Sequence, residues 1–174
     1  MNIVLMGYRG SGKSTIGRKM ADELWKQFAD TDELVCRRFG NISIKEIWER
    51  HGEPAFRKAE CEVVGELLAK GNQVIALGGG TVMQPEARAA LQAAPNTNRI
   101  YLKCDPQELH RRIQADAQTA ATRPALSGLN GSIEEIRKVL AEREPVYEAL
   151  ATQVFDVTHC KPEDAVMHII RRCL

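Results

Sequence analysis

The chain has 174 residues, with 24 basic and 23 acidic side chains, so its formal net charge at pH 7 is +1. A chain of this length can bury a sizeable core as one domain, and its balanced charge excludes binding to nucleic acid or a membrane surface through bulk charge. The 5 cysteines are widely spaced and include no C-x-x-C pair, which indicates reduced thiols rather than a zinc or redox site. We expect a monomer whose partners are small molecules.

The position of the first apolar segment bears on where the protein is located. This segment begins within two residues of the N-terminus, which leaves no room for a signal peptide, and no apolar stretch in the sequence approaches membrane-spanning length. We therefore expect a cytoplasmic location.

Residues 2–15, NIVLMGYRGSGKST, contain the strongest functional signal in the sequence. An apolar run leads into a glycine-rich turn with the spacing of a phosphate-binding P-loop, from Gly7 to Gly12, and an amphipathic helix then begins near Lys13. Glycines permit positive φ, so backbone N–H groups can converge on a phosphate at the positive end of the helix dipole. The nucleotide-binding residues expected here are Gly10, Ser11, Gly12, Lys13, Ser14 and Thr15.

Two side chains of this loop have specific expected roles. Lys13 reaches the β- and γ-phosphates, and the Ser14 hydroxyl binds Mg²⁺, which prefers oxygen ligands. The alternative is a glycine-rich loop that only joins a strand to a helix. It does not account for the agreement of the strand, the glycines, the Lys-Ser pair and the helix.

Strand and helix signals alternate along the remaining sequence, which predicts an α/β fold with three layers, a five-stranded parallel sheet between helices. The strands are expected at residues 3–6, 27–31, 73–77, 99–103 and 153–157. Ser132 and Glu135 have the spacing of a capping box at the start of a late helix, and Pro145 is expected to kink or end that helix.

Asp30 and Asp32 flank Thr31 at the carboxyl end of the expected second strand. Ligands bind outside this end of a doubly wound sheet, so both carboxylates are candidates for contact with a metal or with substrate hydroxyls. The alternative is an acidic turn in which Asp32 caps the next helix. A common P-loop arrangement has an apolar strand ending in the Asp that binds Mg²⁺ through water, and Asp30 is the nearest substitute here.

Two further features have a structural and a functional interpretation. Arg57 and Glu60 lie one helical turn apart, and this spacing suits an ordinary surface ion pair or a Glu60 that holds Arg57 for an anion; the pattern alone favours the surface pair. Gly78, Gly79 and Gly80 follow the third strand. Glycine costs roughly 0.5 to 1 kcal/mol relative to alanine in regular structure, so we interpret this run as a place where the backbone approaches a ligand.

Residues 116–131 are small, polar and unpatterned except for Arg123 before Pro124. Long connections in compact domains are usually functional or disordered. The segment is a candidate lid whose Arg123 closes over the transferred phosphate, and the alternative is a solvated loop arginine.

Several motifs together resemble the shikimate kinase family, in the nucleoside-monophosphate-kinase branch of P-loop proteins. They are GYRGSGKST at 7–15, DTD at 30–32, GEPAFR at 52–57, GGG at 78–80, TRPAL at 122–126 and REPVY at 143–147. The resemblance covers nearly the whole chain. It implies ATP- and Mg²⁺-dependent phosphorylation of the 3-hydroxyl of shikimate, in aromatic amino acid biosynthesis, on a sheet with strand order 2-3-1-4-5. It also implies one P-loop kinase domain over residues 1–174, with a substrate-binding helical region at about 32–60 and a lid at about 113–131.

The resemblance implies a role for each candidate residue. The catalytic residues are Lys13, Asp32 and Arg123. The substrate-binding residues are Asp32, Arg57, Gly78, Gly79, Gly80 and Arg143, with the two arginines on the carboxylate. Ser14 and Asp30 hold Mg²⁺, the latter through water. Arg112 flanks adenine together with the loop before Pro162, and Arg123 meets the γ-phosphate. The lid is longer than in many members of the family, and residues 158–161 are only weakly like its adenine loop.

Two other functions remain open on the sequence. One is a kinase for another small polyol acid, such as gluconate, on the same fold, and the DTD and GGG motifs argue against it. The other is a nucleotide-binding switch or interaction module. Such a module should lack a second, arginine-lined pocket, whereas Arg57 and Arg143 predict one.

Overall fold

The structure is a computed structural model that describes residues 1–116 and 132–173. Its five strands form one parallel sheet in the order β2-β3-β1-β4-β5, which confirms the fold class and strand order expected from the sequence. The strands are β1 (Asn2–Met6), β2 (Gln27–Asp30), β3 (Gln73–Ala76), β4 (Thr97–Lys103) and β5 (Gln153–Asp156). Each of the predicted strands is present, with boundaries that differ by at most two residues.

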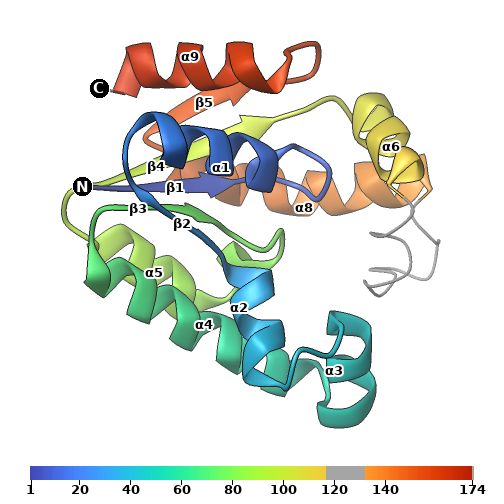
Figure 1. Cartoon of the computed structure of the whole chain (residues 1–174). Coiled ribbons are helices and arrows are strands. Elements are labelled where there is room, and N and C mark those ends of the chain that lie inside the picture. The colour runs from blue at the N-terminus through green and yellow to red at the C-terminus, as the bar shows by residue number, and fades with distance from the viewer. Residues whose placement is uncertain (117–131, 174) are drawn as a thin grey trace.

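Helices cover both faces of this sheet (Figure 1). They are α1 (Lys13–Glu23), α2 (Thr31–Arg38), α3 (Ile44–His51), α4 (Glu53–Lys70), α5 (Pro85–Ala93), α6 (Pro106–Ala115), α8 (Ile133–Leu150) and α9 (Pro162–Cys173), with the short 3-10 helix η1 (Thr81–Met83). The pair α1 and α9 lies on one face, and the pair α4 and α5 on the other (Figure 1). Within the described ranges, no helix is long and apolar enough to cross a membrane.

The central strand β1 contributes to a core on each face of the sheet. Ile3 and Leu5 pack in the cluster that includes the buried side chains of α1 and α9. Val4 and Met6 pack in the cluster that includes those of α4. Successive side chains of a strand point to opposite faces, so β1 is buried from both sides. The carboxyl end of β1, where the glycine-rich loop begins, is therefore firmly positioned.

One expectation about the helices was wrong, and one helix was not predicted. The helix after Ser132 does not end at Pro145, because α8 continues to Leu150 and its last turns bury Tyr147 and Leu150. Packing of these apolar side chains holds the helix together where proline removes a backbone hydrogen bond. The sequence analysis also did not identify α5. Only Ala87 and Leu91 of this alanine-rich helix are buried, so its apolar pattern is weak.

Candidate active site

The loop between β1 and α1 folds around the amino group of Lys13. Gly10 and Gly12 have φ values of +82° and +90°, in the left-handed region that glycine adopts readily. The Nζ atom of Lys13 donates hydrogen bonds to the carbonyl oxygens of Gly7 and Tyr8, both at 2.9 Å. Among the described residues, no side chain caps the N-terminus of α1, so the helix presents its first N–H groups at the mouth of the loop. Together these donors form an anion-binding site.

The first carboxylate of the DTD motif lies beside this loop. The Ser14 hydroxyl donates to Oδ2 of Asp30 at 2.6 Å, while Oδ1 of Asp30 accepts from the backbone N–H of Asp32 at 3.0 Å and of Glu33 at 3.4 Å. Asp30 is therefore the residue that caps α2, and the alternative that Asp32 caps this helix is wrong. The hydroxyl and carboxylate oxygens of Ser14 and Asp30 fit Mg²⁺, which keeps several waters and needs few protein ligands.

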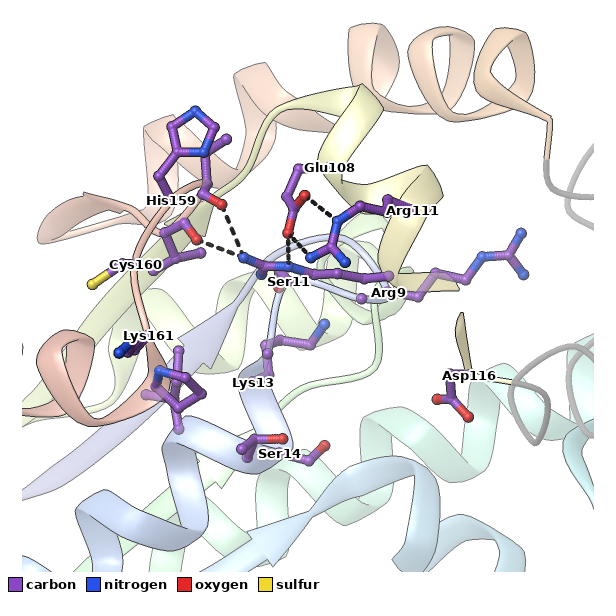
Figure 2. Close-up of a pocket in the computed structure, with 18 of the residues that line it drawn as sticks. Arg9, Ser11, Lys13, Ser14, Glu108, Arg111, Asp116, His159, Cys160 and Lys161 are labelled. Atoms are coloured by element: carbon purple, nitrogen blue, oxygen red, sulfur yellow. Dashed lines mark hydrogen bonds and ion pairs between the residues drawn. The ribbon is translucent and has the colours of Figure 1, made fainter. Parts of the chain in front are cut away.

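A cavity of about 720 Å³ lies over the loop. Figure 2 shows Lys13 and Ser14 on one side of it, Glu108 and Arg111 on another, and residues 159–161 along a third. Hydrogen bonds from Arg111 and Arg112 lower the pKa of Glu108 to about 2, so this carboxylate stays ionised at neutral pH.

Arg112 connects α6 to the segment that follows β5. Its Nε donates to Glu108 at 2.8 Å, and its Nη2 donates to the carbonyls of Val157 at 2.8 Å and Thr158 at 3.1 Å. These contacts hold the segment against the cavity. Arg112 and residues 157–162 thus line the same wall of the cavity.

A second, smaller cavity of about 60 Å³ adjoins the first. It is lined by Tyr8, Arg9, Asp32, Ile44, Trp48, Phe56, Arg57, Glu60, Gly79, Gly80 and Arg143. Arg9 and Asp32 line both cavities. A molecule bound in the small cavity would therefore meet a nucleotide in the large one at these two side chains.

The Arg57–Glu60 pair lies inside this second site. The side chain of Glu60 is 1% exposed and that of Arg57 is 16% exposed, and Nη1 of Arg57 contacts Oε2 of Glu60 at 2.7 Å. The other carboxylate oxygen of Glu60 accepts from the Thr81 hydroxyl at 2.7 Å. The interpretation as a surface ion pair, which the sequence pattern favoured, is therefore wrong.

The surroundings of Arg57 keep its guanidinium charged and fixed. Burial opposes the charge, but the contacts with Glu60 and Glu53 outweigh it and raise the pKa of Arg57. Burial also raises the pKa of Glu60, against the opposing effect of Arg57. The rings of Trp48 and Phe56 lie 5.5 and 5.4 Å from the guanidinium carbon, at distances suited to cation–π contact. Such a rigid guanidinium is suited to binding a carboxylate.

Close packing explains two of the three glycines after β3. A Cβ atom on Gly78 would lie 2.4 Å from Oδ1 of Asp32, and one on Gly80 would lie 2.9 Å from Nη1 of Arg57. For a Cβ on Gly79, the nearest atom in the described part of the chain would be the backbone N of Arg9, at 3.5 Å. The first and third glycines thus let the backbone approach the functional side chains of the site itself, which the sequence interpretation had not foreseen.

The structure brings most of the predicted site residues together. The two cavities contain Gly10, Ser11, Gly12, Lys13, Ser14, Thr15, Asp30, Asp32, Arg57, Gly79, Gly80, Arg112 and Arg143. Gly78 adjoins them through Asp32. Arg123 lies outside the described residues.

The sequence analysis missed several residues that line these cavities. Arg9 occupies a position that the P-loop pattern leaves unspecified, so its residue type gave no signal. The sequence analysis gave no role of their own to Trp48 and Phe56, and both line the second cavity. The cavity places them together because α3 packs against α4.

Comparison with known proteins identifies the family. The family model described as shikimate kinase matches residues 9–174. A shikimate kinase from Streptococcus gordonii is 38% identical over 174 residues, covering 100% of both chains, and one from Legionella pneumophila is 40% identical over 172 residues, covering 98% of this chain and 93% of that protein. The solved structure of a shikimate kinase from Acinetobacter baumannii in complex with shikimate has a TM-score of 0.87 and 30% identity, and covers 99% of this chain and 92% of that one. The chain belongs to the shikimate kinase family.

Proposed function

We propose that this protein transfers the γ-phosphoryl group of ATP to the 3-hydroxyl of shikimate, with Mg²⁺, and so serves aromatic amino acid biosynthesis. The proposal rests on one observation: two cavities share Asp32 and Arg9 as lining residues. One cavity lies above a P-loop, and the other is lined by Arg57 and Arg143. The complex of the Acinetobacter relative with shikimate supports the same acceptor.

On the nucleotide side, the roles follow from the contacts of the P-loop. Lys13 would exchange its bonds to the loop carbonyls for bonds to the β- and γ-phosphates, where charge develops during transfer. Ser14 and Asp30 would hold Mg²⁺, which neutralises phosphate charge when bound. Arg112 would flank the adenine. A role for Arg123 on the γ-phosphate, and a lid at about 113–131, rest on the sequence resemblance alone.

On the acceptor side, Arg57 and Arg143 would bind the carboxylate of shikimate, and the turn of Gly78 to Gly80 would face its ring and hydroxyl edge. The Asp32 carboxylate would accept the proton of the attacking hydroxyl, whose oxygen forms the new bond to phosphorus as the bond to the β-phosphate oxygen breaks. No covalent enzyme intermediate is needed.

We also propose that the protein acts as a monomer in the cytoplasm. Residues of one chain line both cavities, so the proposed site requires no second copy. The described cysteines Cys36, Cys61, Cys104 and Cys160 are free thiols, which suits a reducing compartment.

A coupled assay of ADP release tests the proposed activity. With ATP and Mg²⁺, we expect ADP to form when shikimate is added and not when it is omitted or replaced by gluconate. Turnover with gluconate would favour a kinase for another polyol acid. ATP hydrolysis that is unaffected by either acid would favour a nucleotide-dependent switch.

Arg57→Ala is expected to weaken shikimate binding by roughly 1.5 to 3 kcal/mol, about 10- to 150-fold in Kd, the range for a hydrogen bond to a charged group. Arg50→Ala is the matched control, because Arg50 is an exposed arginine of α3 paired with Glu46. Titration calorimetry measures both affinities, and ATP affinity should not change. Unchanged shikimate affinity in Arg57→Ala would place the carboxylate elsewhere.

Asp30→Asn is expected to raise the Mg²⁺ concentration needed for half-maximal rate, by about 10- to 100-fold as for other residues that orient metal ligands. The amide loses the negative charge, but asparagine remains a good helix cap for α2, so the melting temperature should change little. Asp22→Asn changes an exposed aspartate of α1 and serves as the control. A wild-type Mg²⁺ dependence would remove Asp30 from the metal site.

A further inference from the structure

Tyr147 belongs to the REPVY motif at 143–147, of which the proposed function uses only Arg143. The two residues lie one turn apart on α8 and so share one face of the helix. Tyr147 is 1% exposed, and its ring stacks on Tyr101 with the ring centroids 5.0 Å apart. Its hydroxyl donates a hydrogen bond to the carbonyl oxygen of Gly79, in the turn beside the acceptor cavity.

This hydrogen bond fixes a peptide group whose other side is available to a ligand. The structure has no cis peptide among its described residues, and a trans peptide directs its C=O and N–H in opposite directions. With the Gly79 carbonyl held by Tyr147, the N–H of Gly80 points away from Tyr147. Gly80 lines the acceptor cavity, whereas Tyr147 does not. In residues 1–116 and 132–173, the Gly80 N–H donates to no protein acceptor.

A buried N–H without a protein partner is costly, and ligands or water commonly supply the missing acceptor. Arg143 also lies close to this turn. Its Nη1 would lie 3.6 Å from a Cβ atom on Gly79, and its positive charge acts to lower the pKa of Tyr147, against the larger effect of burial. Burial raises the pKa of Tyr147 to about 12, so the hydroxyl remains a donor throughout the neutral range.

We propose that Tyr147 is a positioning residue for the acceptor: its hydroxyl orients the Gly79–Gly80 peptide so that the Gly80 N–H donates to an oxygen of bound shikimate. Arg143, which is proposed to bind the carboxylate, lies one helical turn before Tyr147 on α8. Tyr147 touches neither substrate. This inference rests on the proposed function, because it concerns the affinity of the site for shikimate.

Tyr147→Phe tests the proposal, because it removes the hydroxyl and leaves the ring that stacks on Tyr101. Tyr101→Phe is the matched control. It removes the other hydroxyl of the same stacked pair, which donates to Glu144 of α8 at 3.2 Å. We expect Tyr147→Phe to raise KM for shikimate roughly 3- to 10-fold, the effect of one hydrogen bond, with KM for ATP unchanged. Tyr101→Phe should leave both KM values unchanged.

Thermal melting of each variant sets the assay temperature, so that wild type and variants are compared where all are folded. A wild-type KM for shikimate in Tyr147→Phe overturns the inference, as do equal losses for both substrates or an equal rise in Tyr101→Phe, since these indicate a structural role. Wild-type protein without shikimate-dependent turnover overturns the proposed function itself. An active wild type with an unaffected Tyr147→Phe overturns only the role of Tyr147.

Discussion

Lys13→Ala is expected to lower the rate of phosphoryl transfer by on the order of 10² to 10³ while the protein stays folded. The Lys13 ammonium is held over the P-loop by two carbonyl oxygens at 2.9 Å, in the position from which it can meet the phosphates. Its contribution grows as charge develops on the transferred group, so the loss should be in the chemical step more than in ATP binding.

Single-turnover kinetics with saturating ATP and shikimate measures this step directly. Lys19→Ala provides the matched control, because Lys19 lies on the same helix and pairs at the surface with Glu163. The control should retain wild-type rates, and both variants should melt close to the wild type. A near-normal chemical step in Lys13→Ala would remove the P-loop lysine from the mechanism.

Asp32→Asn is expected to lower kcat by on the order of 10² to 10⁴, the range for loss of a general base. Asp32 lies in the first turn of α2 and lines both cavities, so its carboxylate is placed between donor and acceptor. Asparagine has nearly the same shape, but it cannot take the proton of the attacking hydroxyl.

Glu33→Gln is the control for this substitution, because Glu33 is the next residue of α2 and is exposed. Steady-state kinetics over a range of Mg²⁺ concentrations separates Asp32 from Asp30. Asp32→Asn should lower kcat and shikimate affinity with an unchanged Mg²⁺ requirement. Asp30→Asn should chiefly raise the Mg²⁺ requirement. Identical phenotypes would show that the two aspartates do not have separate roles.

Local signals predicted the sheet and the nucleotide loop well. The order of apolar strand, glycines, Lys13 and Ser14 defines a P-loop through residues adjacent in the chain, and the structure has this geometry. Asp30 ends β2, whose pairing with β3 fits the alternation of strands and helices, and Asp32 follows in the first turn of α2. In both cases, the signal that predicted these residues lies in short, continuous segments of the sequence.

The acceptor site depends on contacts between distant segments, and here the sequence was less informative. Nothing local to Glu60 shows that Thr81, from a different element, covers its carboxylate. The roles of Gly78 and Gly80 likewise depend on Asp32 and Arg57, which approach from other helices. An i, i+3 spacing cannot distinguish an exposed ion pair from a buried one, because burial depends on the packing of the whole helix.

The position of the phosphate ester in the product tests most directly whether the hydroxyl beside Asp32 is the one that attacks. We would incubate the protein with ATP, Mg²⁺ and shikimate and examine the product by correlated phosphorus and proton NMR. Coupling of the new phosphorus signal to the proton on carbon 3 of shikimate is the predicted result. Phosphate on another oxygen, or no transfer of phosphate from ATP to shikimate, would contradict it.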